Sequence, residues 1–456
     1  MAALSYWFLS PSFLLALAGQ IRGWEETEPT PVRSWRTATV DAIVPAYNEE
    51  STIALALESL TRQDFPLRQI IVVDDASTDR TAEVVRRYAE LSSRNIVSVL
   101  RNEQVGKTPA IREICQQSDA DVLFVLDADT VLMDSNYVSR SVEELFRNAG
   151  VASVCGQVMP LQHTTLSAAA HRSMTLAQLS GEFAGIMSSV QNRWTRLLIW
   201  FTIVYRTALY LFLSRLVYDG HLKLLGGTLN PAGCAVAYRR DRLTECFAYA
   251  QPKIGDNLSS SEDIYIGHFF NWKGYRNVHI SAIRCESAEP PVTRLWRQLF
   301  LWSSSFFQSS YYFPSLPLTV LKWRSHFIAR LSKRRIPERR QAREQYRAPW
   351  GEGYTKRYGR PIGLISCLSL VEKVTFPAIL LGLMIFYPDV ALLSLLIEIL
   401  ISAAAVAVVS DSGARLRGAG MMIAATPIRL MSMIVDVAAM TRFALDMAIG
   451  QRNWRK

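Results

Sequence analysis

Short runs of apolar residues alternate with amphipathic stretches along the chain after Val40. Four of these runs have the length and the valine, isoleucine and leucine content of strands, at residues 41–45, 69–73, 96–100 and 122–126. Helical spacing of apolar residues passes through Leu55, Leu57 and Leu60, and recurs at 81–91 and around 111–115. This alternation predicts an α/β domain with a mostly parallel, Rossmann-like sheet that helices cover on both faces.

Both ends of the chain are more apolar than the middle. Residues 2–18 are apolar except for serines and Pro11, and arginines follow them. This order predicts a retained membrane anchor at residues 1–20, with its carboxyl end in the cytoplasm. A signal peptide is the alternative, because residues 16–18 resemble a cleavage site.

The last hundred residues contain span-length apolar runs. We expect a C-terminal transmembrane region at 361–456, with spans at 362–387 and 390–409 and either a third span or an interfacial helix at 421–447. Glu372 and Lys373 within the first run indicate either a protein-lined path or the true start of a shorter helix.

An apolar segment also interrupts the middle of the chain. Residues 196–217 have nearly the length of a span but carry Arg196, Arg206 and Arg215. A single crossing there would place the chemistry before and after it on opposite sides of the membrane. We therefore predict an interfacial or buried helix, with its arginines extending to the lipid headgroups, inside a cytoplasmic catalytic domain at 38–290.

Charge and cysteine content narrow the class of protein. The formal net charge is +10, and much of the excess lies between Lys322 and Arg347, interleaved with apolar residues. This pattern predicts an amphipathic basic segment at 291–360 that faces anionic lipid. Nucleic-acid binding is the alternative, but no nucleic-acid motif accompanies the charge, so no such partner is expected. The six cysteines show no CxxC spacing, and zinc is not indicated.

Polar residues gather where the predicted strands end. Residues 45–49 (PAYNE) follow the first strand and residues 74–79 (DDASTD) follow the second. Carboxylates and hydroxyls in these places suit the hydrogen-bond donors of a nucleoside. Either segment by itself is more typical of a turn rich in Asp, Ser and Asn.

Two further acidic motifs carry candidate chemistry. Asp127 and Asp129 flank Ala128 directly after an apolar strand, so both carboxylates are expected to point to one side. Such a pair suits Mg²⁺ or Mn²⁺ that also binds donor phosphates. Glu262 and Asp263 form the second motif, where a carboxylate is a candidate general base. The alternative is a helix start that Ser261 caps, and both readings are compatible.

The motifs VPAYNEE, VDDASTD, LDADT and SED occur in this order. In that order they resemble the family-2 inverting glycosyltransferases of the GT-A fold, over roughly residues 40–308. With its apolar flanks, the chain is most similar to the hyaluronan, chitin-oligosaccharide, poly-N-acetylglucosamine and cellulose synthase group. The resemblance implies a GT-A glycosyltransferase domain with flanking interfacial and transmembrane helices.

The resemblance also implies roles for individual residues. The implied contacts of a uridine-type nucleoside are Pro45, Tyr47, Glu49 and Asp75. Lys107 would lie near the nucleotide, and Asp127 and Asp129 would bind the donor and the metal. Asp263 would be the general base, with Glu262 beside it in the catalytic cluster.

One motif departs from the family pattern. The synthases carry QxxRW on a helix at the membrane surface, and here Gln298 and Trp302 match while Leu301 replaces the arginine. Arg297 or Arg294 is a candidate substitute for binding the diphosphate, because helical neighbours lie three and four residues apart. Trp302 is a candidate to stack on the acceptor sugar, or else an interfacial aromatic residue.

Together these features predict a hexosyltransferase in the bacterial-type inner or plasma membrane. It would use Mg²⁺ or Mn²⁺ to transfer sugar from a UDP-sugar to a growing oligo- or polysaccharide at the cytoplasmic face, and the spans leave product export open. The alternatives are single transfer to a lipid-linked or protein acceptor, which the missing arginine favours, and a non-catalytic membrane partner, which the intact carboxylates disfavour.

Overall fold

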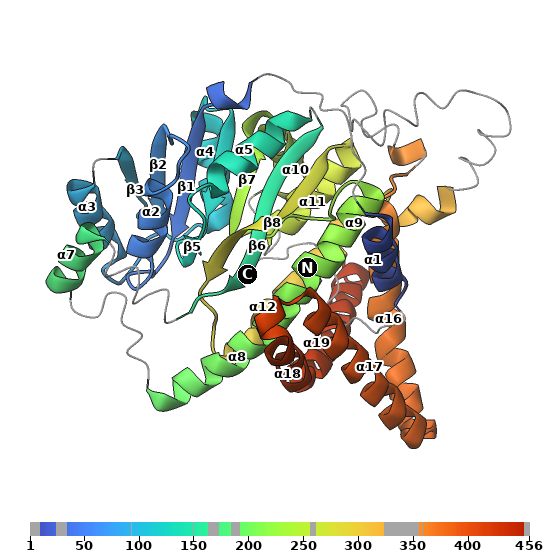
Figure 1. The fold of residues 1–456 in the computed structure, drawn as a ribbon. Helices are drawn as coiled ribbons and strands as arrows, with labels where there is room; N and C mark the ends of the chain where they lie inside the picture. Colours follow the sequence, from blue (N-terminus) through green and yellow to red (C-terminus); the bar gives the residue numbers. More distant parts are fainter. Residues whose placement is uncertain are drawn as a thin grey trace.

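The structure of this chain is a computed structural model that describes residues 10–23, 34–92, 94–148, 150–162, 173–183, 192–255, 261–322, 355–357 and 359–450. Residues 1–9 of the predicted anchor and nearly all of the basic run at 322–347 lie outside these ranges. Within them, an α/β domain lies against a group of long helices (Figure 1).

One mixed sheet of eight strands organises the α/β domain. Its strands are β1 (Val40–Ala46), β2 (Gln69–Asp74), β3 (Ile96–Leu100), β4 (Val122–Leu126), β5 (Thr130–Leu132), β6 (Val151–Pro160), β7 (Ala235–Arg239) and β8 (Arg276–Ser287). Their order is β3-β2-β1-β4-β7-β6-β8-β5. The four strands predicted from the sequence are confirmed and form a parallel block. Beyond β4 the sheet is mixed, because β7 runs antiparallel to β4 and β6.

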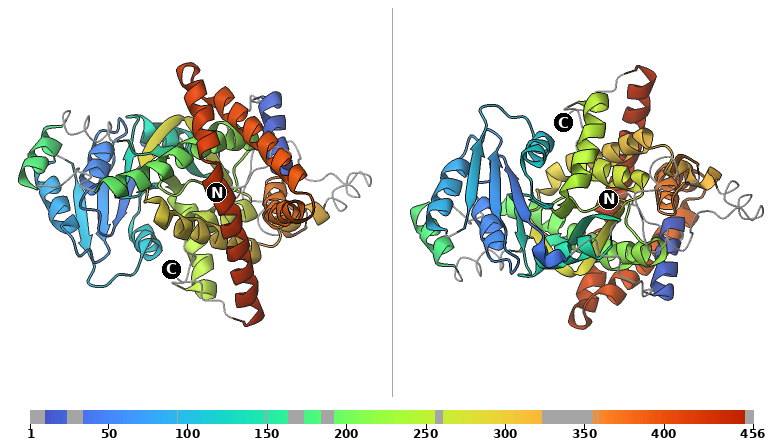
Figure 2. Two further views of the ribbon diagram at one scale, coloured as in Figure 1. Left: turned by 90° about the horizontal axis from the view of Figure 1, so that it is seen from below. Right: turned by 90° about the horizontal axis from the view of Figure 1, so that it is seen from above.

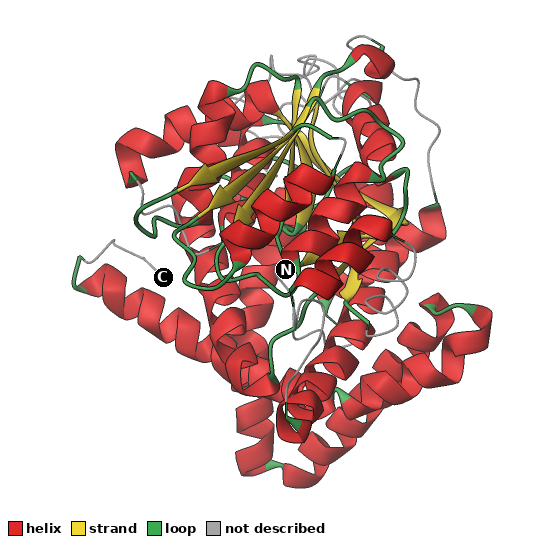
Figure 3. Ribbon diagram, turned by 90° about the vertical axis from the view of Figure 1, so that its left-hand side faces the viewer, coloured by secondary structure: helices red, strands yellow, loops and turns green. Residues whose placement is uncertain are grey.

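Helices cover both faces of this sheet, as the α/β pattern predicts (Figure 3). Those packed on the first core are α2 (Ile53–Thr61), α3 (Thr81–Leu91), α5 (Tyr137–Arg147) and α7 (Met174–Glu182). Those packed on the second core are α4 (Lys107–Gln117), α10 (Arg240–Ile254) and α11 (Glu262–Lys273). Along β1, Val44 belongs to the first core and Ile43 to the second, because successive side chains point to opposite faces.

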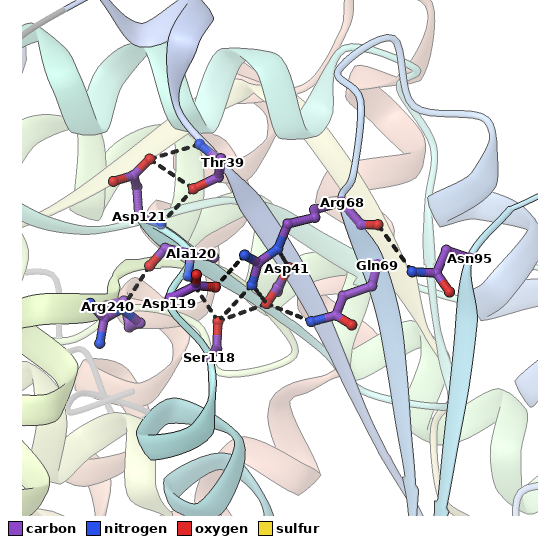
Figure 4. A network of polar contacts seen from close by, with 10 residues as sticks. All are labelled: Thr39, Asp41, Arg68, Gln69, Asn95, Ser118, Asp119, Ala120, Asp121 and Arg240. Carbon is purple, nitrogen blue, oxygen red and sulfur yellow. Dashed lines mark hydrogen bonds and ion pairs between the residues drawn. The ribbon is translucent and has the colours of Figure 1, made fainter.

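An ion pair between the buried Asp41 and the partly exposed Arg68 fixes the amino ends of the central strands (Figure 4). Asp41 of β1 is fully buried and accepts hydrogen bonds from Arg68 Nε at 2.8 Å and Arg68 Nη2 at 2.6 Å. Gln69 and Ser118 donate to the same carboxylate at 2.9 and 2.7 Å. This end of the sheet is thus closed by structural contacts, which leaves the carboxyl ends of the strands for ligands.

A long helical rod underlies the sheet and includes the predicted segment at 196–217 (Figure 1). It consists of α8 (Arg193–Leu211), the π-helical η2 (Phe212–Tyr218) and α9 (Asp219–Leu225). The rod is long and apolar enough to cross a membrane, and half of its most apolar stretch is buried in the molecule. The helix α1 (Pro11–Arg22) crosses α9 where Gly19 meets Gly220.

The other helices follow the last strand. They are α12 (Val292–Tyr312), α16 (Gly363–Phe386), α17 (Pro388–Val409), α18 (Arg415–Ala424) and α19 (Thr426–Ala448). Short 3₁₀ turns occur at η1 (Trp35–Thr37), η3 (Pro317–Lys322) and η5 (Ser412–Ala414). Both views in Figure 2 place the first strands toward one end of the molecule and α16 and α17 toward the other.

Within the described residues, α16 and α17 also have the length and hydropathy of membrane spans, and α18 and α19 form a broken pair bent by 47°. Glu372 and Lys373 lie inside α16, so the prediction that they mark the start of a shorter helix is wrong. Both are buried: Glu372 accepts bonds from the Ser12 amide and hydroxyl, and Lys373 pairs with Asp436 of α19. The two charges therefore join helices to one another.

Candidate active site

The loops after β1 and β2 are tied together at the carboxyl edge of the sheet. Asn48 and Ala76 adopt left-handed backbone conformations with φ of 57° and 64°, which are unusual for residues with a Cβ atom. Asn48 Oδ1 accepts a hydrogen bond from the Thr78 amide at 2.8 Å, and its own amide donates to Ser77 Oγ at 2.9 Å. The two segments predicted to meet a nucleoside therefore form one rigid edge.

The four predicted nucleoside residues occupy this edge. Pro45 ends β1 together with Ala46, and the side chain of Tyr47 is exposed. Asp75 accepts hydrogen bonds from the Val105 and Gly106 amides at 3.0 and 2.7 Å. Asp75 thus also fixes the loop that leads into α4 and its first residue, Lys107.

A cavity of about 260 Å³ lies beside this edge. The lining residues that the sequence predicted as functional are Lys107, Asp127, Asp129, Glu262, Asp263, Gln298 and Trp302. The four predicted nucleoside residues and Arg297 do not line it. The structure therefore gathers seven predicted residues that are spread over nearly two hundred positions of the chain.

Lys107 joins the two acidic motifs. Its Nζ lies 2.6 Å from Asp127 Oδ1 and 2.8 Å from Glu262 Oε1. Burial lowers the pKa of Lys107, but the charges of these two carboxylates outweigh burial and raise it well above its usual value. The positively charged side chain of Lys107 is thus held between the end of β4 and the start of α11.

Asp127 and Asp129 both face the cavity, while Ala128 between them is buried in the core, as their spacing predicts. Asp129 Oδ1 accepts hydrogen bonds from Thr130 Oγ1 at 3.1 Å and Ser287 Oγ at 3.4 Å. Burial raises the pKa of Asp127 to about 7, with Lys107 opposing and the Asp129 charge adding to the rise. The pKa of Asp129 is also raised, chiefly by burial.

Glu49 completes the acidic side of the site. Burial raises its pKa to about 7, and the charges of Asp129 and Asp127 add to the rise. Glu49, which follows β1, and Asp127 and Asp129, which follow β4, therefore act on one another across the carboxyl edge of the sheet. Buried like charges of this kind are stabilised when a cation binds between them.

The residues present fit a divalent cation if water and substrate phosphates complete its coordination. Among the described residues, no group of three or more His, Cys, Asp or Glu side chains is placed to hold a metal. Asp127 and Asp129 supply carboxylate oxygens on the same side of the chain, which is the donor type that Mg²⁺ and Mn²⁺ prefer. The site therefore fits an ion whose remaining ligands are water and the phosphates of a substrate.

Asp263 lies in the first turn of α11, where a helix favours negative charge. Its Oδ2 accepts a hydrogen bond from the Gly233 amide at 3.1 Å. A Cβ atom at Gly233 would lie 2.8 Å from the Asp263 carboxyl carbon, so a glycine is needed there. Burial, followed by the charge of Glu262, raises the pKa of Asp263 to about 6. The predicted Ser261 side-chain cap does not form.

Arg206 contacts Gln298 and Trp302, the two residues that match the QxxRW pattern. Its Nη2 donates to Gln298 Oε1 at 2.7 Å, and its guanidinium carbon lies 4.3 Å from the Trp302 ring centroid. Its Nε lies 3.4 Å from Glu289 Oε2. The prediction that Arg206 extends to lipid headgroups is wrong, because this side chain is fully buried behind the cavity.

Arg297, the substitute suggested by helical spacing, lies elsewhere. Its side chain is exposed and lies over the ring of Trp296 at 5.5 Å. Leu301 lines the cavity where the resembling synthases carry arginine. The sequence could not reveal Arg206 as the neighbour of this motif, because the contact joins two helices 92 residues apart.

Several other cavity residues were not singled out from the sequence. They are Tyr210, Ser214, Tyr218, His279 and Glu289. Burial raises the pKa of Glu289 to about 7, while Arg206 lowers it and the Asp129 charge adds to the rise. The sequence assigned a role to none of these five residues, and Tyr210, Ser214 and Tyr218 lie in or directly after the apolar segment at 196–217.

Comparisons with known proteins concern the same region. Residues 41–210 match the family model described as Glycosyl transferase family 2. Poly-beta-1,6-N-acetyl-D-glucosamine synthase of Staphylococcus epidermidis is 24% identical over 161 residues, which are 33% of this chain and 38% of that protein. Undecaprenyl-phosphate 4-deoxy-4-formamido-L-arabinose transferase of Pectobacterium carotovorum is 38% identical over 93 residues, 20% of this chain and 28% of that protein.

The chain thus aligns with 38% and 28% of the length of these two relatives. Among solved structures, a mannosyltransferase of Pyrobaculum calidifontis in complex with GDP-Man and Mn²⁺ is 17% identical, with a TM-score of 0.45 over 92% of this chain and 94% of that chain. The family match confirms the resemblance drawn from the order of the motifs and the predicted α/β fold class. This chain carries a glycosyl transferase family 2 domain, which includes β1 to β6 and most of α8.

Proposed function

We propose that this chain catalyses metal-dependent, inverting transfer of a sugar from a UDP-sugar to a growing oligo- or polysaccharide at the cytoplasmic face of a membrane. The observation that carries the proposal is the convergence of Asp127, Asp129 and Asp263 on one cavity, with Lys107 between the two acidic motifs. The family-2 domain supports transfer of a sugar as the reaction class.

The donor end of the reaction rests on Asp127 and Asp129. These carboxylates would hold Mg²⁺ or Mn²⁺, which supplies Lewis-acid neutralisation of the diphosphate leaving group when bound. Lys107 would place a second positive charge near the nucleotide. Pro45, Tyr47, Glu49 and Asp75, at the neighbouring edge, are proposed contacts of the uridine-type nucleoside.

The acceptor end rests on Asp263. We assign to Asp263 the role of general base, which takes the proton of the attacking acceptor hydroxyl. We assign to Glu262 the role of holding Lys107 in position. As the hydroxyl oxygen bonds to the anomeric carbon, the bond from that carbon to the diphosphate oxygen breaks on the opposite face. Inversion follows from this geometry without a covalent enzyme intermediate. Gln298 and Trp302 are proposed to hold the acceptor sugar.

A donor screen tests the proposal. Purified full-length protein in lipid receives UDP-glucose, UDP-N-acetylglucosamine, UDP-galactose or UDP-glucuronate with Mg²⁺ or Mn²⁺, and UDP release and saccharide products are measured. We expect turnover with at least one donor, loss of turnover with EDTA, and recovery with added metal. Asp127→Ala should remove turnover, and Asp241→Ala on the surface of α10 serves as its control. Absence of turnover with every donor and metal would overturn the proposal.

The cavity also supports a second candidate, transfer of one sugar to a lipid-linked acceptor. Leu301 in place of arginine favours it, as does similarity to an undecaprenyl-phosphate sugar transferase. Product size separates the two candidates. A single added sugar that extracts into organic solvent with its acceptor identifies single transfer, whereas a ladder of water-soluble saccharides identifies polymer formation.

The apolar helices support a location in the membrane. The rod from α8 to α9, together with α16 and α17, has the length and hydropathy of spans. We propose that the α/β domain faces the cytoplasm, where nucleotide sugars are available, and that lipids surround α16 and α17. Export of the product along these helices extends the proposal, and a vesicle assay that measures saccharide inside and outside the membrane tests it.

A further inference from the structure

Part of the cavity wall is uncharged and has no role in the reaction proposed above. The residues that form it are Gly156, Val158, Leu213, Ser214, Tyr218 and His279. They form a continuous wall because β6 pairs with β8, which carries His279, and His279 contacts η2, which carries Ser214 and Tyr218. An uncharged wall of aromatic, aliphatic and hydroxyl groups suits a neutral polar ligand.

Ser214 and His279 are a hydrogen-bonded pair with unused capacity. Ser214 Oγ lies 3.2 Å from His279 Nε2, and both residues are more than nine-tenths buried. His279 Nδ1 and Asp219 Oδ1 lie 3.9 Å apart, and neither atom has a hydrogen-bond partner among the described residues. If Nδ1 carries the proton toward Asp219, Nε2 accepts from Ser214, and the lone pairs of Ser214 remain for a ligand hydroxyl.

The segment that carries Ser214 is held in an unusual conformation. Residues 212–218 are π-helical, a rare geometry that occurs frequently at functional sites. Gln20 of α1 donates from its Nε2 to the carbonyl oxygens of Arg215 and Leu216, each at 2.9 Å. The protein therefore stabilises the π-helix from outside and directs Ser214 and Tyr218 to the cavity.

This wall lies beside the proposed base. Asp263 and Tyr218 line the same cavity, and Tyr210 and Trp302 add further aromatic surface to it. Aromatic rings pack on the apolar faces of a sugar ring, while hydroxyl and imidazole groups bond its edge.

We infer that Ser214, Tyr218 and His279 form a subsite for an uncharged sugar ring, in which His279 orients Ser214, Ser214 accepts a hydrogen bond from a sugar hydroxyl, and Tyr218 packs on the ring. This inference rests on the proposed function. Two sources supply such a ring, the donor and the acceptor. The position beside Asp263 places the acceptor ring there, since the base must reach the attacking hydroxyl.

Kinetics of full-length protein in lipid distinguish the sources. The variants are Ser214→Ala, which removes one hydroxyl, and His279→Phe, which keeps a ring but no nitrogen; Ser139→Ala on the exposed face of α5 is the matched control. With the donor found in the screen, KM is measured for donor and acceptor, together with UDP affinity and donor hydrolysis in the absence of acceptor.

We expect Ser214→Ala to raise the acceptor KM about five- to tenfold, the loss of one neutral hydrogen bond, and His279→Phe, which leaves Ser214 without the partner that orients it, to raise the acceptor KM as well. UDP affinity and donor hydrolysis should match Ser139→Ala. A rise in donor KM and loss of donor hydrolysis, with acceptor KM unchanged, would assign the ring to the donor and overturn the acceptor assignment.

The outcomes also separate this inference from the proposed function. Wild-type protein without turnover would refute the proposed function itself. Wild-type turnover, combined with wild-type KM values for donor and acceptor in both correctly folded variants, would refute the subsite alone. Thermal unfolding of each variant checks that it folds. If His279→Phe does not fold, Ser214→Ala still tests the subsite, because that substitution deletes only one oxygen atom.

Discussion

Asp263 combines a helix start, partial burial and a hydrogen bond from the Gly233 amide at 3.1 Å. If it is the base, Asp263→Asn removes the proton acceptor but keeps the shape and the Gly233 contact. We expect kcat to fall about 10²- to 10⁴-fold, the usual contribution of general-base catalysis, with UDP affinity unchanged. Steady-state kinetics and calorimetric UDP binding check both values. Turnover close to wild type in the amide variant would remove the assignment.

The same residue predicts a pH dependence. Burial and the charge of Glu262 raise the pKa of Asp263 to about 6. A base works only when unprotonated, so activity should be full above this pKa and decline as pH falls through it. The kcat profile between pH 5 and 8 measures this, with Asp263→Glu expected to shift the acid limb and Asp241→Asn expected to leave it in place. A flat profile across this range would contradict the prediction.

Arg206 forms a buried ion pair with Glu289, which lines the cavity. Arg206→Met leaves the Glu289 carboxylate without its cation, so we expect a loss of about 3–5 kcal/mol of unfolding free energy. Adding Glu289→Gln should restore much of that loss, because no buried charge remains. Thermal or denaturant unfolding in detergent measures both variants, and Arg140→Met, which breaks an exposed pair with Glu143, should cost under about 1 kcal/mol. Equal losses in the single and double variants would exclude this pairing.

Sequence spacing could predict the carboxylates but not their neighbours. Asp127 and Asp129 follow an apolar strand at a spacing that fixes their common side, and Lys107 follows a glycine at a helix start. Arg206 and His279 lie on apolar segments whose partners are 92 and 65 residues away. Such contacts depend on how helices pack, which no local pattern of polar and apolar residues specifies.

Among the elements, α1 shows what apolar composition leaves open. The membrane anchor at residues 1–20 stays a prediction, and its described part is a twelve-residue helix packed against α9 and η2. His221 of α9 contacts the Ser12 carbonyl oxygen at 3.1 Å, and Gln20 satisfies carbonyls of the π-helix. The helix thus supports a wall of the cavity, which apolar composition alone does not distinguish from lipid contact.

The crossing of α1 and α9 depends on two glycines. A Cβ atom at Gly19 would lie 1.9 Å from the Gly220 carbonyl oxygen, which is backbone and cannot move aside. We expect Gly19→Ala to separate the two helices, to lower the melting temperature by several degrees and to increase hydrogen exchange in residues 212–218. Gly181→Ala is the control, because its added methyl meets no atom within 4 Å. Unchanged exchange in the π-helix would show that α1 does not support it.

The π-helical geometry of residues 212–218 could not be predicted from the pattern of apolar and polar residues. Residues 196–217 were expected to be one interfacial or buried helix, and the helical character is confirmed. The change from α- to π-geometry at Phe212 has no local marker such as proline or glycine. The π-helix receives hydrogen bonds from Gln20 of α1, which lies nearly two hundred residues earlier in the chain.

At the scale of the whole molecule, structural contacts and the candidate active site lie at opposite ends of the strands. The Asp41–Arg68 pair closes the amino ends of the strands, whereas the candidate active site lies at their carboxyl ends (Figure 4). Strand and helix alternation predicted this parallel half. The mixed half could not be predicted, because β6, β7 and β8 are joined through long helical insertions whose return path local pattern does not determine.

The relation of the α/β domain to the apolar helices leads to a prediction about topology. The turn between α16 and α17 points away from the sheet (Figure 1). If both helices cross the membrane, Asp389 at that turn and Asp119 on the domain surface lie on opposite sides. In intact cells, a membrane-impermeant maleimide should label Asp389→Cys, and should label Asp119→Cys only after detergent is added.

The native cysteines provide a low background for this experiment, because Cys115, Cys155, Cys246 and Cys285 are buried. A variant with Cys234→Ser and Cys367→Ser removes the other two thiols and gives the baseline. The acidic cavity and Asp119 belong to the same rigid sheet, so labelling at Asp119 reports the side on which donor sugar must arrive. Labelling of both cysteines in intact cells would place the candidate active site on the same side as the α16–α17 turn, where a cytosolic nucleotide sugar could not reach it across the membrane.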